Sequence, residues 1–174
     1  VRGGVGFDES QGAGGTNIGE GDHRGMNNSA TVEELAQVNG GTVRNISPKG
    51  YAVLNAQDPL VAAMSSTTAA QTIFFSMDKH HPVLATHRSQ GKRSVFVEGE
   101  AIIATEGAWR DSIPLSDVPI TGNGRIGFQV QNVMAAVAAA WALGIPSETI
   151  RRGLSSFASD TDNAPGRFNT FKIN

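Results

Sequence analysis

Apolar residues recur along this chain in short runs and in one long Ala-rich stretch, and the two patterns predict different elements. Short runs rich in β-branched and aromatic residues, bounded by Gly, Pro, Asn or Ser, are typical of strands. Such runs occupy Thr42–Ile46, Tyr51–Asn55, Gln71–Met77, Ser94–Glu98 and Ala101–Thr105. The last two alternate around Gly99 and therefore predict a β-hairpin.

Helical signals stand between these runs. Thr31 and Glu34 fit a capping box, which predicts a helix that runs through Val38 and stops at Asn39-Gly40-Gly41. Asp58-Pro59 predicts the start of a short helix, because proline is well tolerated in a first helical turn.

The longest helical pattern lies late in the chain. Phe128–Leu143 is Ala-rich, and Gly144 and Pro146 follow it as stop signals. Ser147 can then cap a second helix that runs to about Phe157.

Residues 1–29 are rich in Gly and Asn without periodicity and predict mostly loop, and Arg167–Ile173 predicts a last strand. Strands and helices alternate in the first half of the chain, and a hairpin and two helices follow. This order predicts an α/β fold, with a mixed sheet flanked by helices and an antiparallel hairpin.

Composition narrows the class of protein. The 174 residues are 39% hydrophobic, which suits one domain with a packed core. The net charge of −2 argues against a general nucleic-acid binder. Without Cys there is neither a disulfide framework nor a Cys-based metal site. No apolar run reaches the roughly 18 residues of a membrane-spanning helix, and the first residues lack a signal-peptide pattern. These features are compatible with a cytoplasmic protein.

Candidate chemistry begins with the polar stretch TNIGEGDHRG, residues 16–25. Asp22 and His23 in this glycine-rich loop can hold a cation through a carboxylate and an imidazole. The alternative is a solvated loop in which Asn17 and Asp22 serve turns. A single Asp-His pair does not decide between the two interpretations.

Two further stretches place polar residues where α/β proteins bind ligands. In YAVLNAQDP, Asn55 and Asp58 follow a strand, but they can equally turn the chain and cap the next helix. In GRIGFQVQN, Gln129 and Asn132 share a face at a helix start. Their carboxamides offer the donor and acceptor that the edge of adenine needs, although ordinary polar residues also occupy first helical turns.

The remaining signals are an arginine and three histidines. Arg167 in APGRFN lies after a rigid Pro-Gly turn and can grip a phosphate or a carboxylate, or can be a surface residue of a linker. No carboxylate lies at a close ligand spacing to all three of His80, His81 and His87, and we interpret them as solvated or structural residues.

Taken together and in order, these stretches resemble the Mur-ligase family. The resemblance rests on RGG…GFD, TNIGEGDH, TVEELAQV, GYAVLNAQDPLVAAM, GRIGFQVQNVMAAVAAAWALGIP and APGRFN. It implies part of an ATP-dependent amide-forming ligase that requires Mg²⁺. Within the family, the sequence of these motifs is most similar to that of ligases that add arginine to aspartate side chains of a poly-aspartate backbone. The partners so implied are ATP, the two amino acids and their polymer, and the full-length enzyme would be a homo-oligomer.

The resemblance also implies site residues and domain limits. His23 would be the metal-site histidine, Asn17, Gln129 and Asn132 would bind the nucleotide, and Arg167 would lie near the ATP phosphates as a catalytic residue. Residues 1–167 would be part of the central ATP-binding domain, and 168–174 the start of the C-terminal ligase domain.

Three departures from the family pattern qualify this interpretation. The chain contains no G-x-x-x-x-G-K-[ST] loop, no lysine in 36–41, and no apolar strand in ESQGAGG before TNI. We therefore expect a fragment that is inactive alone. Two alternatives are a different Mur-type ligase and a non-catalytic remnant that acts as a binding or assembly module.

Overall fold

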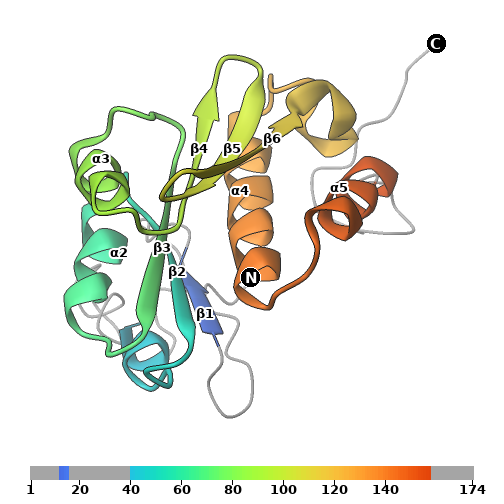
Figure 1. The fold of residues 1–174 in the computed structure, drawn as a ribbon. Coiled ribbons are helices and arrows are strands. Elements are labelled where there is room, and N and C mark those ends of the chain that lie inside the picture. The colour runs from blue at the N-terminus through green and yellow to red at the C-terminus, as the bar shows by residue number, and fades with distance from the viewer. Residues whose placement is uncertain (1–11, 16–39, 158–174) are drawn as a thin grey trace, which may run out of the picture.

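The computed structural model describes residues 12–15 and 40–157, which form one sheet with helices on both of its faces (Figure 1). In this part of the chain the strands are β1 Gly12–Gly15, β2 Tyr51–Asn55, β3 Gln71–Ser76, β4 Ser94–Glu98, β5 Ala101–Glu106 and β6 Trp109–Pro114, in that spatial order. Strands β1 to β4 are parallel neighbours, and β4, β5 and β6 pair antiparallel. The predicted α/β class and its antiparallel hairpin are confirmed.

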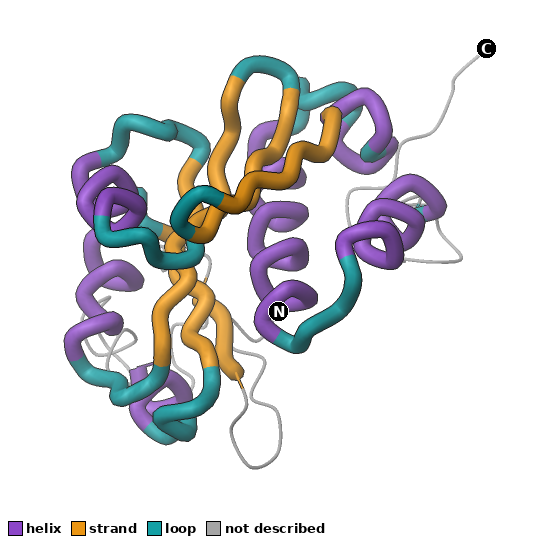
Figure 2. The backbone as a smooth tube through the Cα atoms, viewed as in Figure 1, coloured by secondary structure: helices purple, strands orange, loops and turns teal. Residues whose placement is uncertain are grey.

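Helices cover the two faces of the sheet (Figure 2). Helix α4, Gly127–Ala142, packs on one face, and α2, Pro59–Ala63, and α3, Pro82–Ser89, pack on the other. Helix α5, Ser147–Ser156, follows α4 and contacts the 3-10 turns η3, Leu115–Asp117, and η4, Pro119–Thr121. A further 3-10 turn, η2, Met64–Ser66, extends α2. Among the helices in these ranges, none is long and apolar enough to cross a membrane.

Two apolar cores lie on opposite faces of the sheet, because successive strand residues point to opposite sides. Val53 and Phe75 belong to the α4-side core, whereas their neighbours Leu54 and Phe74 belong to the α2/α3-side core. The α4-side core also contains Ile73, Val95, Ile102, Val130, Val133, Met134, Val137 and Ala138. The α2/α3-side core also contains Val43, Ile46, Val61, Met64, Leu84, Phe96 and Ile103.

The predicted strand Thr42–Ile46 is wrong, because residues 40–44 are helical. The predicted stop at Gly40-Gly41 is wrong for the same reason, since neither glycine adopts the positive φ of a helix end. Val43 and Ile46 are both buried in the α2/α3-side core. Val43 lies among the helical residues and Ile46 lies two residues beyond them. A short apolar run does not by itself separate this arrangement from a strand.

A strand does precede TNI, contrary to the expectation from ESQGAGG. Strand β1 is made of GAGG and pairs in parallel with β2, Gly15 opposite Leu54. A Cβ on Gly15 would lie 3.1 Å from Cγ1 of Val61, and one on Gly12 would lie 3.2 Å from the carbonyl oxygen of Tyr51. The strand therefore uses close backbone packing instead of apolar side chains, and the prediction of mostly loop for 1–29 is wrong at these residues.

The structure also differs from the predicted elements at α3, α5 and β6. No helix is predicted after His80-His81-Pro82, but α3 begins at Pro82 with His81 as its N-cap residue. Helix α5 begins at Ser147 itself, with Pro146 as the N-cap residue and no side-chain cap, so Ser147 is not the predicted cap. Strand β6 has one fully buried residue, Ile113, and its sequence WRDSIP lacks the apolar alternation of a strand.

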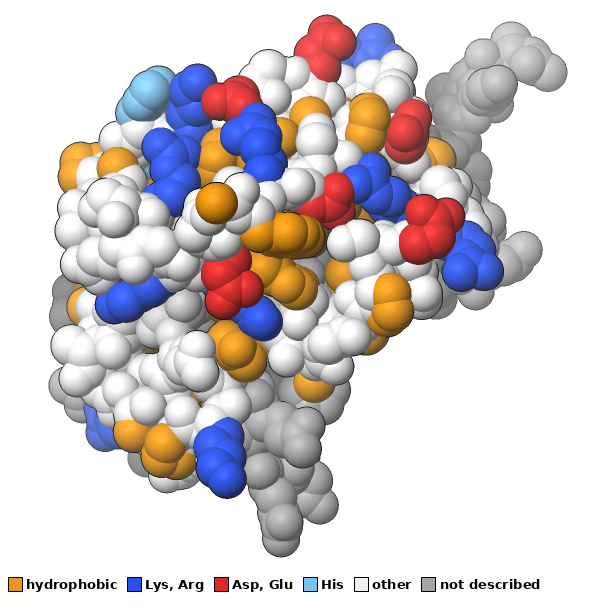
Figure 3. All heavy atoms as spheres, viewed as in Figure 1, with side chains coloured by type: hydrophobic (Ala, Val, Ile, Leu, Met, Phe, Trp, Pro, Cys, Tyr) orange, Lys and Arg blue, Asp and Glu red, His pale blue; other side chains and the backbone are white. Residues whose placement is uncertain are grey.

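On the face seen in Figure 3, acidic and basic side chains are interspersed, and no extended region of one sign appears among the coloured residues. Exposed large apolar side chains in this part of the chain include Trp109, Phe128, Leu143 and Phe157.

Candidate functional site

The carboxyl ends of β2, β3 and β4 lie at one edge of the sheet, at Asn55, Ser76 and Glu98. Helix α4 begins at the same edge. Strand β6 ends at Pro114, which lies opposite Ala101, and Ala101 in turn pairs with Glu98, so β6 ends at this edge. The turns η3 and η4 then connect β6 to α4. In open α/β sheets, ligands bind beyond the carboxyl ends of the strands, so this edge is the candidate site.

Gln129 and Asn132 are brought together on the first turns of α4, as the sequence predicts. Nδ2 of Asn132 donates a hydrogen bond to Oε1 of Gln129 at 3.2 Å. Gln129 is only 5% exposed, whereas Asn132 is exposed. The buried partner therefore orients the exposed one, and the pair presents a carboxamide with donor and acceptor groups to solvent. Ile126, the N-cap residue of α4, makes no side-chain cap hydrogen bond, and the backbone N–H groups at such a helix start favour anions.

Asn55 and Asp58 lie at the same edge and shape the chain there. Oδ1 of Asn55 accepts a hydrogen bond from the Gln57 amide at 2.9 Å. Oδ1 of Asp58 accepts from the amides of Leu60 and Val61 at 3.0 and 3.2 Å, which caps α2. The turn-and-cap interpretation of YAVLNAQDP thus has direct support in the geometry.

The loops that follow β2 and β3 are tied together. Oε1 of Gln57 accepts from the Met77 amide at 2.8 Å. In the second loop, the Ser76 hydroxyl donates to the Asp78 carbonyl and accepts from the Asp78 amide, and the Asp78 carboxylate accepts from the His80 amide. These contacts hold two adjacent loops in fixed positions at the candidate site.

An ion cluster, Lys79, Glu98 and Arg110, closes the same edge beside the hairpin. Nζ of Lys79 lies 2.9 Å from Oε1 of Glu98, and Arg110 pairs with the other carboxylate oxygen. The hydrogen bond from Lys79, and then that from Arg110, lower the pKa of Glu98 to about 2. The carboxylate stays ionised at neutral pH and links three elements. The sequence does not predict this cluster, because its members come from two strands and a loop.

Three predicted site residues, Asn17, His23 and Arg167, lie outside the described residues. Within the described ranges, no group of three His, Asp or Glu side chains could hold a metal ion. The resemblance implies ATP and Mg²⁺ as ligands. The Gln129–Asn132 pair fits the nucleotide, because its carboxamides offer a donor and an acceptor to the edge of adenine.

Comparison with known proteins defines the class. Residues 15–140 match the model of the Mur ligase middle domain. The chain belongs to this family, as its motifs predict.

More particular relatives are the cyanophycin synthetases. The chain is 37% identical to that of Synechocystis sp. over 154 residues, which cover 87% of this chain and 18% of the relative. It is 36% identical to that of Geminocystis herdmanii over 175 residues, covering 99% of this chain and 20% of the relative. It thus spans about a fifth of the length of these curated relatives. It is also 31% identical over 135 residues to the UDP-N-acetylmuramoylalanine–D-glutamate ligase of Pelotomaculum thermopropionicum, covering 76% of this chain and 26% of that ligase.

Solved structures share the fold. MurF from Acinetobacter baumannii matches with a TM-score of 0.62 and 21% identity, over 95% of this chain and 32% of MurF. A pseudomurein peptide ligase type C from Methanothermus fervidus matches with a TM-score of 0.55 and 18% identity, over 87% of this chain and 35% of that one.

Proposed function

We propose that this chain is part of an ATP-dependent amide-bond-forming ligase of the cyanophycin synthetase kind. In this reaction a carboxylate oxygen takes the γ-phosphoryl group of ATP and ADP leaves. An amine nitrogen then displaces phosphate from the acyl phosphate and loses a proton, which yields an amide. The acceptor would be the side-chain carboxylate of an aspartate on a poly-aspartate backbone, and the amine would come from arginine. The product would be cyanophycin polymer.

The Gln129–Asn132 pair is the observation that carries this proposal. Among the described residues, it places an oriented carboxamide at the carboxyl edge of a parallel sheet and beside a helix N-terminus. The carboxamide offers a donor and an acceptor that match the edge of adenine, and the helix N-terminus favours phosphate binding. The cyanophycin synthetase relatives, which match up to 99% of the chain, support the particular kind of ligase.

Other parts of the proposal rest on motifs. Asn17 would contribute to nucleotide binding, His23 would hold Mg²⁺, and Arg167 would stabilise the charge on the ATP phosphates during transfer. Such transfer depends on positioning and on cations more than on covalent chemistry. Residues 1–167 would form part of the central domain and 168–174 the start of the next. The whole enzyme would be a cytoplasmic homo-oligomer.

Replacing Asn132 with Ala tests the nucleotide site. In the full product of the encoding gene, Asn132→Ala should weaken ATP binding by about 1–3 kcal/mol, the worth of one or two buried hydrogen bonds. Calorimetric titration with ATP measures this. Gln90→Ala is the matched control, because it removes an exposed carboxamide at the end of α3, away from the site. Equal ATP affinity in Asn132→Ala and wild type would remove Asn132 from the site.

A second candidate is a ligase for a peptidoglycan precursor, which the 31% identity to D-glutamate ligases favours. Phosphate release can be compared with two sets of substrates, arginine plus aspartate polymer and D-glutamate plus UDP-N-acetylmuramoylalanine. Release with the first set alone supports the cyanophycin synthetase kind, and release with the second alone overturns it.

A further inference from the structure

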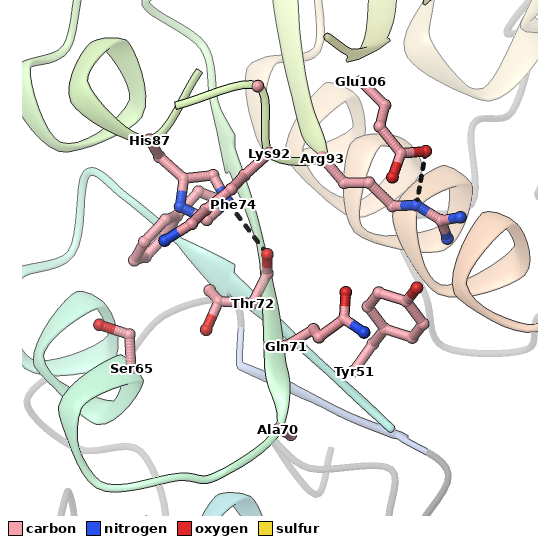
Figure 4. Close-up of a pocket in the computed structure, with 11 residues that line it drawn as sticks. Tyr51, Ser65, Ala70, Gln71, Thr72, Phe74, His87, Lys92, Arg93 and Glu106 are labelled. Atoms are coloured by element: carbon pink, nitrogen blue, oxygen red, sulfur yellow. Dashed lines mark hydrogen bonds and ion pairs between the residues drawn. The ribbon is translucent and has the colours of Figure 1, made fainter. Parts of the chain in front are cut away.

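A pocket lies at the other edge of the sheet, opposite the candidate nucleotide site (Figure 4). Its lining includes Tyr51 and Gln71, the first residues of β2 and β3, and Lys92 and Arg93 from the loop before β4. Glu106 joins it from the end of β5. The pocket has a volume of about 480 Å³. This volume lies in the range of about 300–1,000 Å³ that is usual for small-molecule sites.

One wall of the pocket is held rigid around Arg93. The Arg93 guanidinium lies between two rings, 4.8 Å from the centre of Tyr51 and 4.6 Å from that of Trp141. Its Nε donates to the Glu106 carboxylate at 3.0 Å. The charge of Arg93 is therefore balanced by Glu106, and stacking fixes the position of its side chain.

The opposite side of the pocket is aromatic and uncharged. The ring of His87 meets that of Phe74 edge-on, with 5.0 Å between centres, and Nε2 of His87 lies 3.0 Å from the Thr72 carbonyl oxygen. Both rings are buried. Burial first, and then the charge of Lys92, lower the pKa of His87, so the imidazole is neutral at neutral pH.

Lys92 supplies the remaining charge. It is exposed, and it makes no ion pair within the described part of the chain. In Figure 4 its side chain extends toward the side of the pocket that carries His87, whose pKa its charge perturbs. Among the described lining residues, Lys92 and Arg93 against Glu106 leave one net positive charge. A ligand that neutralises this charge would also cover the aromatic side.

We propose that this pocket binds a small anion with a flat body, and that its carboxylate or phosphate group pairs with Lys92. The flat body lies against the parts of Phe74 and His87 that line the pocket, and the side chains of Gln71 and Thr72, which are also in the lining, can bond polar groups on its rim. The proposal is independent of the ligase function, because the pocket lies at the edge opposite the Gln129–Asn132 pair.

The test uses three probes of the same shape. Benzoate and phenyl phosphate carry the two candidate anionic groups, and benzamide is the uncharged control. Each is titrated into the 174-residue chain labelled with ¹⁵N, and backbone amide shifts are followed. Benzoate, phenyl phosphate or both should move the amides of Gln71, Thr72 and Gly91, and benzamide should not. The probe that binds more tightly identifies the anionic group.

Lys92→Gln should weaken binding of the preferred anion by about tenfold, the loss expected for one charge-assisted contact. Arg152→Gln removes one positive charge from an exposed position on α5 and should match wild type. An unchanged amide spectrum away from the pocket shows that Lys92→Gln is folded. The proposal is overturned if neither anion moves the pocket amides, if benzamide binds equally well, or if Lys92→Gln binds as wild type does.

Discussion

At the scale of single residues, His87 is a buried titratable group held by packing and one hydrogen bond. Its ring packs edge-on against Phe74 and bonds the Thr72 carbonyl. Burial, followed by the charge of Lys92, lowers its pKa below 6.5, and the Thr72 and Arg93 backbone groups act in the opposite direction. The folded state therefore favours the neutral imidazole more than the unfolded chain does.

This difference makes stability depend on pH in a defined window. As pH falls below 6.5, the unfolded chain takes up a proton at His87 before the folded chain does. The free energy of unfolding is therefore highest above pH 6.5 and falls as pH drops toward the lower folded pKa. Urea midpoints at pH 7.5, 6.5 and 5.5 measure this slope.

His87→Gln should flatten that slope, because Gln does not titrate, and its amide can still donate to the Thr72 carbonyl. His80→Gln is the control, since His80 is exposed and should leave the slope as in wild type. A slope that persists in His87→Gln would show that another group carries the acid sensitivity.

Residue roles that depend on local spacing could be predicted from the sequence. Asp58 before Pro59 predicts a capped helix, and Gln129 with Asn132 predicts two carboxamides on one helical face; the structure has both. The pairing of Glu98 with Lys79 and Arg110 could not be predicted, because it depends on the register of β4, β5 and β6 and on the path of the loop after β3.

At the scale of elements, β1 is a strand whose position depends on the absence of side chains. Gly15 lies against Val61 and Leu54, both fully buried, and a Cβ there would lie 3.1 and 3.7 Å from their side-chain carbons. A Cβ on Gly14 would have its nearest neighbours at 3.8 and 3.9 Å, which is ordinary contact.

Gly15→Ala should therefore lower the free energy of unfolding by about 1–3 kcal/mol through overpacking. Gly14→Ala, the matched control in the same strand, should be neutral or stabilising by about 0.4–1 kcal/mol, because it restricts the unfolded chain. Urea denaturation of both variants measures the difference. Equal stability of the two would mean that β1 can move away from Val61 without loss.

Elements whose apolar residues repeat regularly could be predicted from the sequence. Elements that form only because of the strands or helices packed beside them could not. The β4–β5 hairpin and α4 follow the predicted ranges to within a residue or two at their ends. Strand β6 is half polar because it lies at the edge of the sheet, and β1 has glycine at three of its four positions, so neither gives a periodic signal. Val43 lies within the helical residues 40–44 and Ile46 lies two residues beyond them, and this run is too short for burial at a spacing of three to reveal a helix.

At the scale of the whole molecule, the order of elements predicts the α/β class, but the number of strands and the pairing of the edges come from tertiary packing. The same strands serve both cores. Phe75 is buried on the α4 side and Phe74 on the α2/α3 side, one residue apart in β3. Loss of packing on one face therefore loosens the strand that supports the other face.

Phe75→Ala tests whether the two cores unfold as one unit. Removing a fully buried phenylalanine should lower the free energy of unfolding by about 3–5 kcal/mol, a large part of the roughly 5–15 kcal/mol typical of a domain. The two tryptophans, Trp109 and Trp141, have ring centres 5.0 Å apart, and Trp141 packs against the α4-side core. Tryptophan fluorescence therefore reports mainly that face, whereas far-UV circular dichroism reports all elements. Because β3 carries both cores, both signals should shift to the same lower urea midpoint.

Phe157→Ala, at a side chain that is 43% exposed, should move neither midpoint appreciably. If fluorescence shifts in Phe75→Ala while circular dichroism keeps a later, separate transition, the α2/α3 side unfolds independently, and the shared strands do not couple the two faces.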